Sequence, residues 1–215
     1  MRLPIDPSLR RALKTCAVEL DALDADWAVA GATAMQAGGY SRATRDIDLF
    51  IGDDARADLI ARLRARGLPV QGIFPPHHYR VAGRSRRDPE ASIDLLFPAL
   101  GVESLGLLAA TRMPIEGMSM PVVPIHHLVA LKLATDPHID PSRYTRDVAG
   151  LLALHERGLV DPIRVRQVLE DAREVEGCAR LSALMGGTLG APSGPSEPTT
   201  PSTRPAKRGR GSRRG

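Results

Sequence analysis

Three aspartates in otherwise apolar runs are the residues of this sequence best suited to do chemistry. Asp46 and Asp48 lie in the run DIDLFI, and Asp94 lies in the run SIDLLF. Alternate side chains of a β-strand point to the same face, so Asp46 and Asp48 are expected to project together. Two neighbouring carboxylates repel each other, and each raises the pKa of the other. A divalent cation between them removes that repulsion, and Mg²⁺ prefers such oxygen ligands.

Asp94 repeats the anomaly, because it is an acid inside an apolar strand. An unpaired carboxylate buried there would be costly or would become protonated. Three strand acids on one sheet can share a metal site, in which two hold ions that bridge nucleotide phosphates. The third then orients or deprotonates an attacking hydroxyl. Each acid taken alone also fits a structural role, as a solvated strand end or a hydrogen-bonded core residue.

A turn of small residues precedes the acid pair. The run WAVA predicts a short buried strand, after which Gly31-Ala32-Thr33-Ala34 lets the backbone turn closely into a helix that Gly38-Gly39 stops. The backbone N–H groups at such a helix start suit a phosphate. These features form an ordered set: a strand, a tight turn, two strand acids, and a third acid beyond a crossover. Each part alone fits a structural role, but the set as a whole favours a functional site.

The elements that must position these residues follow from the hydrophobic periodicity. Helical spacing predicts helices over 8–23, 55–66 and 102–110, and apolar or alternating runs predict strands at 27–30, 46–51, 68–74, 78–82, 91–97, 111–115 and 120–123. From Pro124 onward the pattern predicts three helices, over 125–134, 142–156 and 162–174. We therefore expect an α/β (α+β) fold in which a small mixed β-sheet with packed helices (1–124) precedes a C-terminal helical region (125–185).

The last segment, 186–215, is rich in Pro, Ser and Gly and then in Arg and Gly, and this composition predicts a disordered tail. Six of the 29 basic residues lie in it, with Glu197 as its acid, which leaves 23 basic and 24 acidic residues for the rest. The basic pI of about 9.5 therefore comes from the tail, which is where weak nucleic-acid binding is expected. The absence of a long apolar run argues against a membrane partner, and cytoplasm is the expected location.

The ordered set resembles the nucleotidyltransferase superfamily related to DNA polymerase β. GATAM, GGYSRATRDIDLFI and SIDLLF match its pattern of a small-residue turn into a helix, an Asp-x-Asp pair and a third Asp on a neighbouring strand. Within the superfamily the chain is most similar to bacterial AbiEii-like proteins, many of them toxins of toxin–antitoxin systems. Four segments carry that likeness: 31–34, 42–48, Leu128 to Lys132, and Arg146-Asp147.

The resemblance implies a role for each matching residue. Asp46, Asp48 and Asp94 would be catalytic and would bind Mg²⁺ (or Mn²⁺), with Asp94 acting as, or positioning, the general base. The turn at Gly31, Ala32 and Thr33 would contact the triphosphate, although Ala32 stands where many relatives have Gly or Ser. Two cations, Arg42 and Lys132, would contact phosphate or nucleotide.

The function that this implies is transfer of a nucleoside monophosphate from an NTP to a hydroxyl acceptor. The acceptor stays open between RNA or tRNA, a protein and a small molecule, and a cognate antitoxin or toxin is a candidate partner. One alternative is a non-catalytic module that kept the fold and binds a nucleotide or a protein. Another, a DNA-binding factor, needs a basic recognition helix, and the acids of 162–174 weaken that case.

Overall fold

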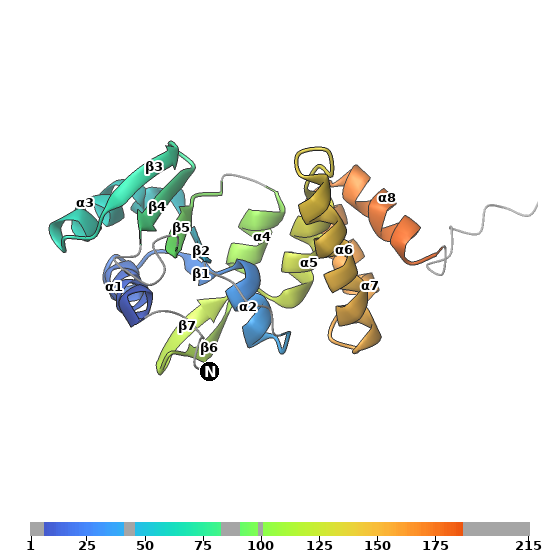
Figure 1. Ribbon diagram of the computed structural model, residues 1–215, viewed down its shortest axis with the longest axis horizontal. Helices are drawn as coiled ribbons and strands as arrows, with labels where there is room; N and C mark the ends of the chain where they lie inside the picture. The colour runs from blue at the N-terminus through green and yellow to red at the C-terminus, as the bar shows by residue number, and fades with distance from the viewer. Residues whose placement is uncertain (1–6, 41–45, 83–90, 99–100, 187–215) are drawn as a thin grey trace, which may run out of the picture.

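The computed structural model of the protein describes residues 7–40, 46–82, 91–98 and 101–186. Its strands form one mixed sheet, and most of its later helices gather at one end of the molecule (Figure 1). The strands are β1 (Trp27–Val29), β2 (Asp46–Ile51), β3 (Val70–Phe74), β4 (His78–Ala82), β5 (Ser92–Leu96), β6 (Thr111–Ile115) and β7 (Met118–Val122). Their order is β3-β4-β5-β2-β1-β7-β6, with β2 parallel to β5 and β1 parallel to β7. The predicted α/β fold with a mixed sheet is confirmed.

Helices cover the sheet and build the C-terminal end. They are α1 (Pro7–Ala22), α2 (Gly31–Ala37), α3 (Arg56–Ala65), α4 (Val102–Leu108), α5 (Ile125–Ala134), α6 (Pro141–Glu156), α7 (Pro162–Asp171) and α8 (Val175–Leu184), with a short 3-10 turn η1 (Asp53–Ala55) before α3. The pattern predicts three helices after Pro124, whereas the described region has four. Arg173 adopts a φ of 60°, which ends the helical path and separates α7 from α8. None of the described helices is both long and apolar enough to cross a membrane.

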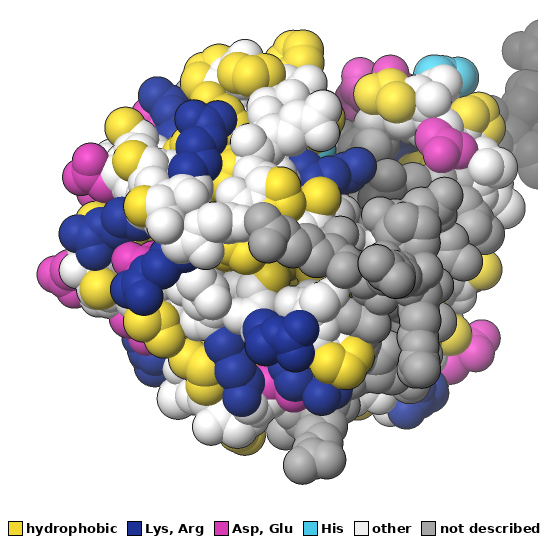
Figure 2. All heavy atoms as spheres, turned by 60° about the vertical axis from the view of Figure 1, so that its left-hand side comes forward, with side chains coloured by type: hydrophobic (Ala, Val, Ile, Leu, Met, Phe, Trp, Pro, Cys, Tyr) yellow, Lys and Arg dark blue, Asp and Glu magenta, His cyan; other side chains and the backbone are white. Residues whose placement is uncertain are grey.

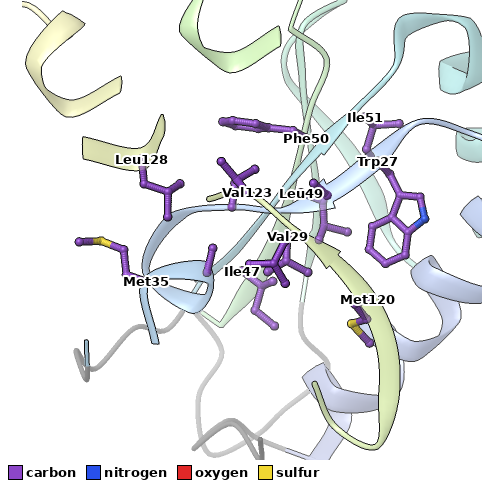
Figure 3. Close-up of a cluster of buried hydrophobic side chains, with 14 of the residues drawn as sticks. Trp27, Val29, Met35, Ile47, Leu49, Phe50, Ile51, Met120, Val123 and Leu128 are labelled. Atoms are coloured by element: carbon purple, nitrogen blue, oxygen red, sulfur yellow. The ribbon is translucent and has the colours of Figure 1, made fainter. Parts of the chain in front are cut away.

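Strand β2 has one face in the core and the other toward the candidate site. Ile47, Leu49 and Ile51 are fully buried, and Figure 3 shows them among side chains from β1 and β7. Met35 of α2 and Leu128 of α5 approach the same cluster (Figure 3). A shift of one residue in the pairing of β2 would exchange these side chains for its aspartates, so the core fixes the register that aims the acids outward.

Helices α1 and α3 lie side by side and are joined by charge as well as by apolar packing. Glu19 of α1 is only 4 % exposed, and its carboxylate meets Arg66 at 2.8 Å and Arg62 at 3.5 Å. Figure 2 looks onto the α3 and β3 end, where Lys and Arg side chains stand in separate groups among apolar and acidic ones. Arg62 and Arg66 therefore balance an internal acid of the fold.

Candidate active site

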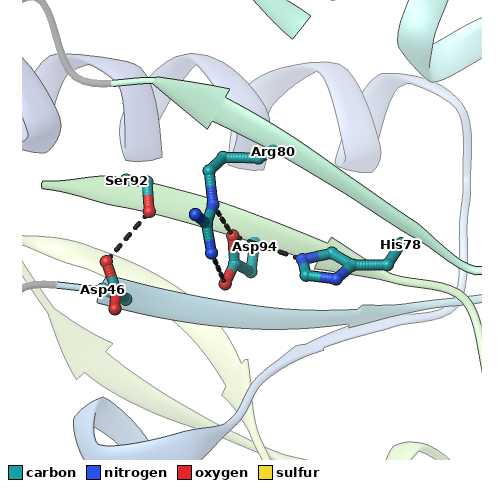
Figure 4. Close-up of polar contacts among 5 residues, drawn as sticks. All are labelled: Asp46, His78, Arg80, Ser92 and Asp94. Atoms are coloured by element: carbon teal, nitrogen blue, oxygen red, sulfur yellow. Dashed lines mark hydrogen bonds and ion pairs between the residues drawn. The ribbon is translucent and has the colours of Figure 1, made fainter. Parts of the chain in front are cut away.

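The parallel pairing of β2 with β5 places the three aspartates at neighbouring positions on one face of the sheet. In its register, Asp46 lies opposite Ser92, and Asp48 lies opposite Asp94. The Ser92 hydroxyl donates a hydrogen bond of 2.9 Å to Asp46 Oδ1 (Figure 4). The sheet thus brings together acids that are far apart in the sequence.

Strand β4 adds two residues that sequence reasoning did not assign to the site, Arg80 and His78. Arg80 lies opposite Asp94 in the antiparallel register, and its Nε and Nη2 donate to Asp94 Oδ1 and Oδ2 at 2.7 and 2.9 Å (Figure 4). His78 Nε2 lies 3.4 Å from the same Oδ1. The spacing of His78 and Arg80, two apart on a strand, is the signal that places both on one face.

These contacts set the charge of Asp94, which is 8 % exposed. Burial raises the pKa of Asp94, but the hydrogen bonds and charge of Arg80, with a smaller contribution from His78, outweigh burial and hold that pKa below its ordinary value. The pKa of Arg80 is raised, chiefly by its hydrogen bond to Asp94, with the charges of Asp46 and Asp48 adding to it. Asp94 is therefore an ionised carboxylate whose two oxygens are already engaged by a guanidinium.

The start of α2 packs directly against Asp48. Gly31 has a φ of 58°, and a Cβ at this position would lie 1.9 Å from Asp48 Oδ2. The Ala30 N–H also donates to the Asp48 backbone carbonyl at 2.8 Å. Only glycine fits both the left-handed backbone and this approach. The glycine of the predicted tight turn therefore allows the start of α2 to pack against the Asp48 side chain.

The other predicted phosphate-contacting residues lie in different surroundings. Thr33 is 1 % exposed, and its buried Oγ1 has no hydrogen-bond partner in the described part of the chain. Ala32 is half-buried in the first turn of α2, and Arg42 lies outside the described residues. A phosphate contact at this turn would therefore use backbone N–H groups and not the Thr33 hydroxyl.

A cavity of about 280 Å³ opens between this face of the sheet and the later helices. We call it the central cavity, and its lining includes Gly31, Asp48, Phe50, Leu96, Glu103 and Lys132. Lys132 of α5 reaches Asp147 of α6, with 2.9 Å between Nζ and Oδ2. The side chains of Lys132 and Asp147 are 23 % and 8 % exposed. Three predicted site residues, Gly31, Asp48 and Lys132, thus meet at one cavity.

Among the charged side chains that line the central cavity in the described part of the chain, acids outnumber bases. Lys132 is accompanied there by five carboxylates, those of Asp48, Glu103, Asp136, Asp140 and Asp147. A bare triphosphate would be repelled by this surface, whereas cations would be attracted. A nucleotide here would therefore need a metal ion to offset its charge.

The carboxylates suit a metal that is shared with substrate. Among the described residues, no group of three or more His, Cys, Asp and Glu side chains is close enough to form a protein-only metal cage. Mg²⁺ is commonly bound by one or two carboxylates together with substrate phosphates and water. Asp46 and Asp48 share a face next to the Gly31 turn, so this pair fits such an ion, while Asp94 is held by Arg80.

No protein-family model matches the chain, and no curated protein matches it in sequence. Solved structures do resemble it. The antibiotic-resistance factor ANT(2'')-Ia has a TM-score of 0.56 at 14 % identity, over 85 % of this chain and 97 % of its own. The chain has the nucleotidyltransferase fold. An antigenic nucleotidyltransferase-like protein from Paracoccidioides brasiliensis gives a TM-score of 0.51 at 18 % identity, over 86 % of this chain and 95 % of its own. The lincosamide antibiotic adenylyltransferase LnuA, with lincomycin bound, is more distant, with a TM-score of 0.47 at 11 % identity, over 70 % and 98 %.

Proposed function

We propose that the protein is a metal-dependent nucleotidyltransferase that moves a nucleoside monophosphate from an NTP to a hydroxyl acceptor and releases pyrophosphate. The observation that carries this proposal is the contact of the Gly31 turn with Asp48, at a cavity that Lys132 also lines. A helix start, a strand carboxylate and a lysine are the parts that a metal-bound triphosphate needs. The nucleotidyltransferase fold supports the same conclusion.

Each residue has a part in this reaction. Asp46 and Asp48 would hold Mg²⁺ or Mn²⁺, which when bound would neutralise phosphate charge. The N–H groups at the start of α2 orient the phosphates, and Lys132 adds a positive charge from the opposite wall. Asp94 completes the acid group and anchors Arg80, whose charge is felt by all three aspartates. Arg42, just before the acid pair, remains a predicted phosphate contact.

The acid-rich lining favours one kind of acceptor. Five carboxylates around the central cavity would repel the backbone of an RNA strand, so a neutral or cationic hydroxyl compound fits this cavity better. The similarity to ANT(2'')-Ia, an antibiotic-resistance factor, is consistent with a small-molecule acceptor.

The segments 42–48 and Leu128 to Lys132 support the AbiEii-like assignment, for which an acceptor protein or an antitoxin is the expected partner.

Labelled NTPs incubated with Mg²⁺, cell lysate and the protein test the reaction. We expect label to enter an acceptor, and EDTA or Asp48→Asn to reduce transfer about 100-fold or more, because each removes charge stabilisation of the transferring phosphate. Asp58→Asn, which changes an exposed acid of α3, is the matched control and should stay active. Equal transfer by Asp48→Asn contradicts the proposed site. Mg²⁺-dependent NTP binding without any transfer favours the non-catalytic module.

A further inference from the structure

Glu103, the second residue of α4, lies where three cavities meet. It lines the central cavity beside Asp48 and Lys132. It also lines a cavity of about 270 Å³ that His77 and His78 border, and a third of about 450 Å³ that Glu174 borders. A ligand in any of these cavities would contact the Glu103 carboxylate. No motif in the sequence singles this residue out.

Glu103 differs from the neighbouring acids in its partners. Asp94 is bound by Arg80 and Asp147 by Lys132, whereas within the described chain Glu103 has no ion pair or hydrogen bond with another side chain. Burial is the main cause that raises the pKa of Glu103; a hydrogen bond with its own backbone lowers that pKa in part, and the charge of Glu174 raises it. Glu103 is an acid in the first turn of α4, which favours the helix, but no ion pair accounts for its half-buried carboxylate.

The surroundings of Glu103 explain why it stays without a partner. Helix α4 packs against β2, α5 and α7. Across the three cavities, the described lining carries the acids Asp48, Asp136, Asp140, Asp147 and Glu174, the lysine Lys132, and the imidazoles of His77 and His78. Lys132 is the cation of this set, and Asp147 already holds it. The net field around Glu103 is therefore negative, which favours a group that accepts protons near neutral pH.

We propose that Glu103 is the catalytic base of the reaction, which rests on the proposed transferase function. Its carboxylate takes the proton as the acceptor O–H bond breaks. The acceptor oxygen then forms its bond to the α-phosphorus. The bond from that phosphorus to the bridging oxygen breaks, and pyrophosphate leaves with the electron pair. Asp94, with both oxygens on Arg80, is an anchor in this scheme and not the proton acceptor.

The decisive experiment compares Glu103→Gln with wild type in steady-state transfer to the acceptor found by labelling. We expect kcat to fall about 100-fold while KM for the NTP changes little, because a general base contributes to the chemical step. Glu103→Asp should regain part of that loss. Glu156→Gln, at an exposed glutamate at the end of α6, is the matched control and should behave as wild type.

Thermal unfolding of the same variants separates catalysis from structure. Because the pKa of Glu103 is raised on folding, its ionisation destabilises the folded state as pH rises above the ordinary Glu pKa. Glu103→Gln should therefore unfold at the same or a higher temperature than wild type at pH 8, and the difference should vanish in acid. A loss of kcat that follows a loss of folding overturns the proposal, and so does unchanged kcat.

Glu174→Gln supplies a second readout that leaves Glu103 in place. Removing the neighbouring charge should lower the Glu103 pKa, so the acidic limb of kcat against pH should move to lower pH. An unmoved limb overturns the assignment. The two proposals fail differently: a wild type that transfers no label from any NTP refutes transferase and base together, whereas an active wild type with an equally active Glu103→Gln refutes the base alone.

Discussion

At the scale of single residues, the candidate site depends on a glycine, which lacks a Cβ, and on one ion pair. The absent Cβ of Gly31 lets the start of α2 reach Asp48, and the guanidinium of Arg80 keeps Asp94 charged inside the sheet. Each feature has a cost in folding free energy: a left-handed backbone at Gly31 and a buried carboxylate at Asp94. Such locally unfavourable residues are typical of functional sites, because folding alone would not select them.

Gly31→Ala should abolish the approach of α2 to Asp48. The added Cβ would lie 1.9 Å from Asp48 Oδ2, so the helix or the acid must move, and NTP transfer should fall about 100-fold. Gly67→Ala is the matched control, because Gly67 also has a positive φ but nothing lies within 4 Å of its Cβ position. Each variant should lose about 1–2 kcal/mol of unfolding free energy to backbone strain, with Gly31→Ala losing more. Equal losses in both variants would refute the contact.

Arg80→Gln should destabilise the metal-free protein. It leaves the Asp94 carboxylate, whose side chain is 11 % exposed, without its main partner, and we expect a loss of about 1–2 kcal/mol in chemical unfolding with EDTA present. This loss of unfolding free energy is small for a buried carboxylate, because the Arg80 side chain is 39 % exposed and solvent screens its charge. Arg112→Gln breaks the exposed pair with Asp21 and should cost less than about 1 kcal/mol. A larger loss for Arg112→Gln would contradict this ranking.

Sequence alone predicts only those site residues whose relative positions follow from the geometry of a single helix or strand. The alternation in DIDLFI places Asp46 and Asp48 on one face without any knowledge of neighbours. Arg80 joins them only because β4 returns antiparallel onto β5 in one register, and Glu103 only because α4 packs against β2. Such pairings depend on strand order and helix placement, which spacing along the chain does not encode.

At the scale of elements, the pair of Lys132 and Asp147 links α5 to α6 across the central cavity. Its sequence signal, a lysine on an apolar helix, fits a ligand contact and a structural lysine equally well. The structure gives Lys132 both a buried partner and a place in the cavity lining. The two roles can be separated, because one depends on Asp147 and the other does not.

Lys132→Met should weaken both stability and NTP binding. The loss of a charged partner for Asp147 should cost about 1–3 kcal/mol of unfolding free energy, and the NTP dissociation constant should rise about tenfold or more. In the double variant Lys132→Met with Asp147→Leu, two apolar partners replace the pair, so stability should largely return. Calorimetric NTP titration should still show the weakened binding. If affinity returns together with stability, Lys132 is a structural residue only.

Hydrophobic periodicity predicts most of the elements, and the exceptions have local causes. Asp161 and Pro162 mark the start of α7, where the Asp161 side chain accepts from the Ile163 N–H at 2.9 Å, as an N-cap should. The end of α7 is not predicted, because Arg173 takes a left-handed conformation that residues other than glycine adopt infrequently. No composition rule would place a helix boundary at an arginine.

At the scale of the whole molecule, charge is divided between the folded part and the last segment. The basic residues after Met185 are Arg204, Lys207, Arg208, Arg210, Arg213 and Arg214, and the rest of the chain has slightly more acids than bases. The central cavity is acid-rich in turn. Affinity for nucleic acid and transfer to an acceptor should therefore depend on different parts of the protein.

Deleting residues 187–215 should remove RNA binding without affecting transfer. Basic residues bind phosphates by releasing counterions, so the full chain should bind RNA with an affinity that falls steeply as salt rises, and the shortened chain should lose most of it. Transfer to a small acceptor and the melting temperature should stay unchanged. A full-length variant with the six basic residues changed to Gln is the control for chain length. Undiminished RNA binding by both variants would place the contact on the folded part.

The close approach of Gly31 to Asp48 also has a genetic consequence. Every missense change in the Gly31 codon introduces a Cβ, so no replacement at this codon is conservative. In a library of random variants selected for retained activity, this codon should stay unchanged, while the Gly67 codon should accumulate substitutions because its surroundings are open. Mutational tolerance would then report the contact between the helix start and the acid from genetic data alone.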